Sequence, residues 1–250
     1  SRPVHIERRG RGPDIVMLHG WSMHSGVWHD LADRLAASFT LHLVDLPGHG
    51  HSEWQPGDFD FTSLLPALDR QTPDKAVWMG WSLALAQRFP QKVKKVILMA
   101  TTPRFIKDDN WPCAIAPAVF ENFADNLDVN QQQTLQRFLM LQAKGAEQSR
   151  DTIRQLSQQL AQQHTPHPDA LRDGLACLLE VDMRQALADL SCPVQLILGD
   201  RDTLIPSTMP EQAAKLNPAL QLTMLEGAGH APFITQPDQC QHRVEQFIHG

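Results

Sequence analysis

The stretch that most constrains this chain is an apolar run that ends in Gly-x-Ser and leads into a helix-like segment. Ala76 to Met79 has the pattern of a buried strand, and Gly80-Trp81-Ser82-Leu83 follows it directly. A serine at this place would sit on a sharp strand-to-helix turn, with its hydroxyl clear of the sheet and the first N–H groups of the helix near what it attacks. An ordinary turn with a serine helix cap gives the same short motif. The motif alone leaves both interpretations open.

Two later segments supply an acid and a histidine. Leu196 to Asp202 is a buried-strand pattern that ends in two acids, and Gly227 to Pro232 places a histidine directly after a glycine, following another strand. Serine, then acid, then histidine is the chain order of the α/β-hydrolases. Upstream, Ile15 to Trp21 ends a strand in His-Gly-Trp, where that fold places the second donor of its oxyanion hole. Four agreeing signals favour a nucleophile at Ser82 over an ordinary turn.

Strand and helix patterns alternate along most of the chain. Apolar residues at helical spacing in Gly26 to Leu35 separate two strand patterns, and this strand-helix-strand order indicates a parallel sheet. We therefore predict the α/β class, with the α/β-hydrolase fold: a mostly parallel central sheet flanked by helices. The expected strands are residues 4–8, 14–18, 41–45, 76–80, 93–100, 194–199 and 220–225, and further helices are expected at 61–69 and 239–248.

One long segment interrupts this alternation. From Phe105 to about Leu187 the chain has no strand pattern and is rich in Gln, Ala and Leu at helical spacing. We predict an all-helical insertion, at the point where α/β-hydrolases carry a lid over the site. The predicted organisation is a core of residues 1–103 and 186–250 with a helical lid of residues 104–185.

The expected chemistry needs three side chains. A serine hydroxyl is a poor nucleophile, so Ser82 needs a base within hydrogen-bond reach, and that base needs an orienting acid. His230 is the expected base, because imidazole can take and return a proton at neutral pH, and a turn-capping histidine is the alternative. Asp200 and Asp202 compete for the acid. We favour Asp202, which leaves Asp200 to bind its own backbone in a turn.

Backbone N–H groups of Trp21 and Leu83 are the expected oxyanion donors. The side chains of Trp21 and Trp81 either line the acyl pocket or belong to the core, since large aromatic residues beside a sheet do both. Phe138 in the helical segment is a candidate substrate contact with the same alternative. Phe105, Trp111 and Phe123 share this ambiguity.

The connection after Leu83 is short. Only ten residues run from Leu83 to Lys92, with Pro90 among them, and Ala84 stands where G-x-S-x-G has its last glycine. A crossover between parallel strands usually takes a dozen residues or more. Either the crossover is genuinely shortened and the serine poorly supported, or a stretch of residues is absent from this sequence. The second interpretation is favoured because so short a crossover is hard to close.

Composition excludes several classes. A net charge of −6 and a pI near 6.0 provide no basic field for nucleic acid. The four scattered cysteines form no C-x-x-C pair, and the twelve histidines form no metal-binding motif. No apolar leader or membrane-length run is present. We expect a cytoplasmic monomer with reduced thiols, without metal or cofactor, and without a nucleic-acid or membrane partner.

With these residues assembled, the chain resembles the α/β-hydrolases, and within them the family of pimeloyl-acyl carrier protein methyl ester carboxylesterases of biotin synthesis. This resemblance implies hydrolysis of a methyl ester on a pimeloyl chain held by acyl carrier protein, with Ser82, Asp202 and His230 as the triad and Trp21 and Leu83 as oxyanion donors. It spans nearly the whole chain. The motifs that carry it are residues 19–21, 39–48, 80–83, 137–139 and 230–234.

The same resemblance implies that Arg137, Arg150 and Arg154 bind the carrier, which is acidic and bears a phosphate that arginine can bind. Exposed arginines on solvated helix faces are the alternative. Other functions stay open as well. They are a broad-specificity short-chain esterase or a carbon–carbon bond hydrolase of the same fold, and a pseudoenzyme that binds a ligand without turnover.

Overall fold

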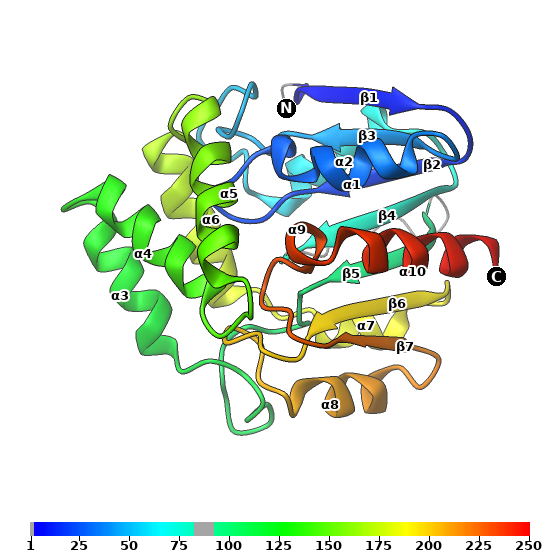
Figure 1. Ribbon diagram of the computed structural model, residues 1–250. Coiled ribbons are helices and arrows are strands. Elements are labelled where there is room, and N and C mark those ends of the chain that lie inside the picture. The colour runs from blue at the N-terminus through cyan, green and yellow to red at the C-terminus, as the bar shows by residue number, and fades with distance from the viewer. Residues whose placement is uncertain (1–2, 83–92) are drawn as a thin grey trace.

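The computed structural model describes residues 3–82 and 93–250, and these build a seven-stranded sheet in the order β1-β3-β2-β4-β5-β6-β7. Neighbouring strands pair in parallel except β1, which is antiparallel to β3. The expectation of a mostly parallel sheet is therefore confirmed (Figure 1). The strands are β1 (Ile6–Gly10), β2 (Asp14–Leu18), β3 (Thr40–Val44), β4 (Ala76–Trp81), β5 (Val93–Met99), β6 (Val194–Gly199) and β7 (Gln221–Leu225).

Helices cover both faces of the sheet because its central strands are apolar on both sides. In β2, Ile15 and Met17 pack with residues of one set of helices, and Val16 and Leu18 pack with the other set. The first set comprises the 3-10 helix η1 (Ser25–Trp28), α1 (His29–Leu35), α9 (Pro232–Thr235) and α10 (Pro237–His249). The second comprises α2 (Phe61–Gln71), α7 (Arg184–Asp189) and α8 (Met209–Leu216).

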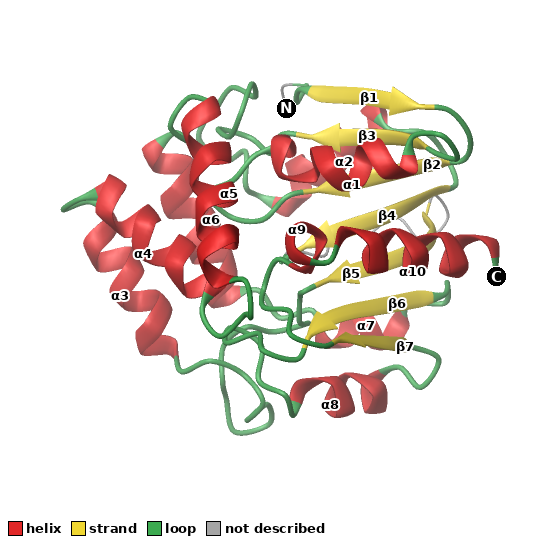
Figure 2. Cartoon of the chain, viewed as in Figure 1, coloured by secondary structure: helices red, strands yellow, loops and turns green. Residues whose placement is uncertain are grey.

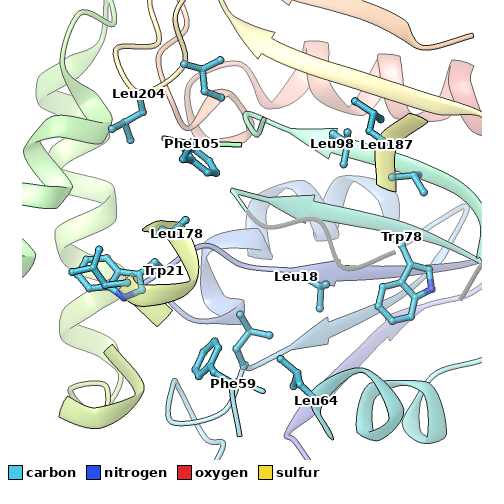
Figure 3. Close-up of a cluster of buried hydrophobic side chains, with 14 of the residues drawn as sticks. Leu18, Trp21, Phe59, Leu64, Trp78, Leu98, Phe105, Leu178, Leu187 and Leu204 are labelled. Carbon is cyan, nitrogen blue, oxygen red and sulfur yellow. The ribbon is translucent and has the colours of Figure 1, made fainter. Parts of the chain in front are cut away.

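The four helices that come next in the chain after β5 lie beyond the carboxyl ends of the parallel strands (Figure 2). They are α3 (Pro117–Leu127), α4 (Gln131–Ala143), α5 (Ser149–Gln162) and α6 (Pro168–Glu180). Most of their buried apolar residues continue the core on one sheet face, as Leu178 does beside Trp21 (Figure 3). Leu139 of α4 and Leu156 of α5 join the core on the other face. Together, α3 to α6 cover the edge at which the strands end, and we call them the roof.

The expectation of an insertion that is helical throughout is wrong in one part. Residues 104–116 form no helix and are joined by isolated bridges, Ile106 to Ile115 and Asp108 to Trp111. The Trp111 indole N–H donates to the Arg104 carbonyl at 3.0 Å. Pro112 lacks the N–H that a helix needs, so a compact loop satisfies the backbone here.

Charged pairs join the two ends of this insertion. Arg104 Nε lies 3.2 Å from Asp108 Oδ2, and Arg104 Nη1 lies 3.3 Å from Asp182 Oδ2. Arg184 Nη2 lies 3.2 Å and 2.7 Å from the same two oxygens. The hydrogen bond from Arg184 lowers the pKa of Asp182 despite its partial burial. These ion pairs therefore hold the beginning and the end of the insertion together.

Other boundaries differ from expectation by a few residues, and Pro66 lies inside α2 beyond its first turn. The connection after Ser82 that was expected to be short, residues 83–92, lies outside the described residues. Among the helices of the described part, none combines the length and apolar character needed to cross a membrane.

Candidate active site

Ser82 directly follows β4, near the centre of the sheet, with β2 and β5 on either side. The φ angle of Ser82 is 64°, in the left-handed region, and 8% of the residue is exposed. This conformation costs a non-glycine residue about 1–2 kcal/mol and persists only where the surroundings enforce it. Ser82 therefore has the strained backbone conformation expected at a sharp turn after β4. The helix expected to follow it lies outside the described residues.

Two further side chains complete a hydrogen-bonded relay with Ser82. Ser82 Oγ lies 2.8 Å from His230 Nε2, and His230 Nδ1 lies 2.8 Å from Asp202 Oδ2. Asp202 Oδ1 accepts the backbone N–H groups of Leu204 and Ile205 at 2.8 and 3.2 Å. The His230 and Asp202 side chains are each 1% exposed, so water does not compete for these bonds.

The partners determine the protonation of the imidazole. Asp202 can only accept, so His230 Nδ1 carries the proton and Nε2 presents a lone pair to the Ser82 hydroxyl. An oxygen whose proton already points at a base can become a nucleophile as that proton leaves. The arrangement can therefore support attack by Ser82 on a carbonyl carbon.

Asp200 has a different position from the one expected. Its carboxylate accepts the backbone N–H of Gly227 at 2.8 Å, rather than binding its own turn. Gly227 belongs to the loop that leads to His230, with a φ of 76°. Asp200 thus ties the loop of the acid to the loop of the histidine, while Asp202 contacts the imidazole.

Trp81 belongs to the core and supports His230. It is 1% exposed, and its indole N–H donates to the His230 carbonyl at 2.8 Å. Its ring packs edge-on against Phe233, with centroids 4.9 Å apart, and a Cβ on Gly20 would lie only 3.0 Å from the ring. The acyl-pocket alternative for Trp81 is therefore wrong, and the chain offered no signal for its bond to His230.

Trp21 stands between the sheet and the roof. Its indole N–H donates to the Leu171 carbonyl of α6 at 2.8 Å, and Gly174 leaves room for its ring. Phe138 packs edge-on against Trp21 with centroids 4.8 Å apart, and against Phe123 at 5.4 Å. Phe138 thus backs the aromatic wall to which Trp21 belongs. Leu83, the other expected oxyanion donor, lies outside the described residues.

Two small cavities of about 20 Å³ each meet at Ser82. Cys177 and Leu178 of α6 line both. Burial and the nearby Asp173 and Glu180 raise the pKa of the Cys177 thiol to about 11, so the thiol stays neutral. The first cavity is also lined by Trp21, Leu46, His49, Phe59 and Gly174, and the second by Thr102, Pro103, Arg104, Phe105, Val181 and Met183.

His49 and Cys177 are not among the site residues predicted from the sequence. His49 stands between two glycines after a strand, which was a usable signal, because loops at the carboxyl end of parallel strands hold sites in this fold class. Cys177 had none. Across residues 3–82 and 93–250, no group of His, Cys, Asp and Glu is arranged to hold a metal ion.

The three arginines belong to α4 and α5 and line neither of the two cavities at Ser82. Arg137 of α4 is exposed and lines a hollow of about 580 Å³ between α3, α4 and α5. Arg150 and Arg154 are exposed on α5, one turn apart, and Arg154 lies 3.6 Å from Asp151. Such exposed pairs contribute little to stability, so these cations are available to a partner.

A parallel sheet with a serine, a histidine and a carboxylate at its strand ends defines a class, and the chain belongs to the alpha/beta hydrolase family, which it matches over residues 15–241. The particular relatives are esterases. Two named pimeloyl-acyl carrier protein methyl ester esterase come from Stenotrophomonas maltophilia and Aeromonas salmonicida. They are 40% and 41% identical over 98% of this chain and 96% and 99% of their own. The family resemblance read from the motifs is thereby confirmed.

Solved structures agree on the fold. An esterase from Exiguobacterium antarcticum superimposes with a TM-score of 0.88 over 99% of this chain and 96% of its own. Only 19% of aligned residues are identical, so this likeness is evidence for the fold alone.

Proposed function

We propose that this chain is a serine carboxylesterase that hydrolyses the methyl ester of pimeloyl-acyl carrier protein in biotin synthesis. The observation that carries the proposal is the relay from Ser82 through His230 to Asp202, with 2.8 Å at each step. The relatives that cover nearly the whole chain support the substrate, because each is named for this ester.

In the proposed mechanism, Ser82 Oγ attacks the ester carbonyl while His230 Nε2 takes its proton. His230 then protonates the methoxy oxygen, methanol leaves, and an acyl-enzyme remains. Asp202 holds the imidazole in place and stabilises its positive charge. The backbone N–H groups of Trp21 and Leu83 are the proposed oxyanion donors, and losing one such donor typically costs about 3 kcal/mol.

The roof provides the proposed substrate and carrier contacts. Residues 104–185 act as the lid, and Trp21, with Phe138 packed behind it, presents an apolar wall suited to a methylene chain. Arg137, Arg150 and Arg154 bind the acidic carrier and the phosphate of its arm. The hollow beside Arg137 adds Lys144 and the apolar Val119 and Met140 to this surface.

The proposed enzyme works as a monomer in the cytoplasm, with acyl carrier protein as its partner and without a cofactor, a nucleic-acid partner or a membrane partner. Its cysteines Cys113, Cys177, Cys192 and Cys240 are free thiols, in keeping with a reducing compartment.

The test uses purified protein and methyl pimeloyl-acyl carrier protein. We expect release of methanol and a free carboxylate by the wild type and none by Ser82→Ala. The kcat/KM for the carrier substrate should exceed that for the same ester without the carrier. Equal values for both substrates would instead identify a broad-specificity esterase, and binding without turnover would identify a pseudoenzyme.

A further inference from the structure

His49 lies in the loop after β3 and has one ring nitrogen without a partner. Its residue is 1% exposed, and Nδ1 lies 3.0 Å from the Pro47 carbonyl oxygen. A carbonyl only accepts, so Nδ1 carries the ring proton. Burial lowers the pKa of His49 to about 4, and near pH 7 the ring is neutral with a lone pair on Nε2. Within the part of the chain that the structure describes, no group donates to that nitrogen.

The neighbouring His19 shows what a purely structural histidine looks like here. Its ring centroid lies 5.3 Å from that of His49, and it is equally buried. His19 Nδ1 donates to the Gly20 carbonyl at 2.7 Å, and Nε2 accepts the backbone N–H of Leu46 at 3.0 Å. Both nitrogens of His19 are used. Leaving a buried acceptor without a partner is unfavourable, so we expect a donor to bind at Nε2 of His49.

The cavity that His49 lines also reaches Ser82. Other polar side chains on its wall are engaged: Trp21 Nε1 donates to Leu171, Ser82 Oγ bonds to His230, and Cys177 Sγ lies 3.9 Å from the Phe59 carbonyl. A cavity of about 20 Å³ has room for about one water molecule. A methylene chain beside His49 would leave Nε2 unsatisfied, whereas an O–H group within reach of that nitrogen would pair with it.

We propose that His49 orients the hydrolytic water during deacylation, by accepting a hydrogen bond from one O–H while His230 Nε2 accepts the other. This inference rests on the proposed esterase function. The water oxygen attacks the carbonyl carbon of the acyl-Ser82 ester. His230 takes one proton and passes it to Ser82 Oγ as the bond from that oxygen to the acyl carbon breaks. The second proton stays on the oxygen of the carboxylic acid product, which then ionises in solution.

This role distinguishes water from an alcohol. Water has two O–H groups and can serve both imidazoles, whereas methanol has one, which His230 must take if methanol is to attack. His49 therefore favours hydrolysis of the acyl-enzyme over its return to a methyl ester. One hydrogen bond of ordinary strength corresponds to a preference of about fivefold.

The experiment measures how the acyl-enzyme partitions between the two nucleophiles. Wild type and variants turn over p-nitrophenyl butyrate in a fixed methanol–water mixture, and butyrate and methyl butyrate are quantified. We expect the ratio of hydrolysis to methanolysis to fall about fivefold in His49→Phe and to recover in His49→Gln, whose Oε1 can accept. His51→Phe, an exposed histidine in the same loop, is the matched control and should keep the wild-type ratio.

The ratio separates this role from a structural one. A variant that only loosens the site would slow both reactions and leave the ratio unchanged, and that result in folded His49→Phe would overturn the inference. Thermal melting checks folding, and His49→Leu replaces His49→Phe, with the same expectation, should the latter not fold. Absence of any ester turnover by the wild type would instead overturn the proposed function, and this step with it.

Discussion

The backbone N–H of His230 donates to the carbonyl oxygen of Gln142 at 3.3 Å, so the last turn of α4 holds the loop that carries the histidine. The Thr203 hydroxyl donates to the Leu141 carbonyl at 3.2 Å, and the Glu147 N–H donates to the Gly227 carbonyl at 3.1 Å. One end of α4 and the turn after it therefore contact both the loop of Asp202 and the loop of His230. The roof positions the relay as well as covering it.

Because of this contact, position 229 has little room for a side chain. A Cβ at Gly229 would lie 3.1 Å from the Ala146 Cβ and 3.4 Å from the Gln142 carbonyl oxygen. We predict that Gly229→Ala lowers kcat about tenfold, because a small displacement of His230 spoils its geometry, and destabilises the protein by about 1–2 kcal/mol. Steady-state kinetics and urea unfolding measure both effects.

Ala146→Gly removes the nearest obstacle and serves as the rescue. The double variant Gly229→Ala with Ala146→Gly should recover most of the lost kcat. A double variant as slow as the single one would show that the α4 contact does not govern the position of His230.

Asp202 and Asp200 should differ sharply in their effect on turnover. Asp202→Asn can present its amide N–H₂ to His230 and so favour the wrong tautomer, and we expect kcat to fall by about 10³ to 10⁴. Asp200→Asn keeps an oxygen that can accept from Gly227, so a loss below about threefold is expected. Kinetics on a small ester compare the two. Equal losses would mean that the acid has been assigned to the wrong residue.

Arg150 and Arg154 are expected to affect only the substrate that is attached to its carrier. Replacing both by alanine should lower kcat/KM for methyl pimeloyl-acyl carrier protein about threefold to tenfold at low salt, since each exposed pair is worth up to about 1 kcal/mol. Hydrolysis of a small ester should be unchanged. High salt should shrink the difference, because it screens exposed charges. A parallel loss on both substrates would argue for a structural defect instead.

Stability should fall as the solution becomes acidic, because of two buried imidazoles. Burial, with the nearby charge of His49, lowers the pKa of His19 to about 3, and burial lowers that of His49 to about 4. Below about pH 6.5 the unfolded chain binds protons at these residues that the folded chain does not, so the free energy of unfolding decreases with falling pH. The slope expected from both is about 2–3 kcal/mol per pH unit between about pH 6 and pH 4.5.

Urea unfolding across this pH range measures the slope. His49→Phe should reduce it by about half, because one of the two groups is removed. A free energy of unfolding that stays level between about pH 7 and pH 5 would mean that these histidines are not held neutral.

The main features of the fold were readable from the order of apolar runs. Each of Ser82, Asp202 and His230 follows an apolar strand pattern, and parallel strands bring their carboxyl ends to one edge, so their proximity was predictable. The choice of Asp202 over Asp200 was harder, because the two acids follow the same strand and lie only two positions apart. The Gly227 N–H that engages Asp200 becomes apparent only when the two loops are placed together.

What was not predictable depends on tertiary contacts that no local pattern encodes. The bond of Trp81 to the His230 carbonyl joins residues 149 positions apart. The irregular path of residues 104–116 lies in a segment whose composition favoured helix. The spare nitrogen of His49 is defined by burial and by the absence of a donor in the described residues, and neither is a property of the motif.

Covalent labelling of Ser82 tests the central claim most directly. An organophosphonate should add once to the folded wild-type protein, giving a single mass increase that peptide mapping places on Ser82. The same reagent should leave folded Ser82→Ala unmodified, with loss of esterase activity in proportion to labelling of the wild type. Folded wild-type protein that takes up no label, or takes it up at another residue while Ser82→Ala still hydrolyses esters, would contradict the account.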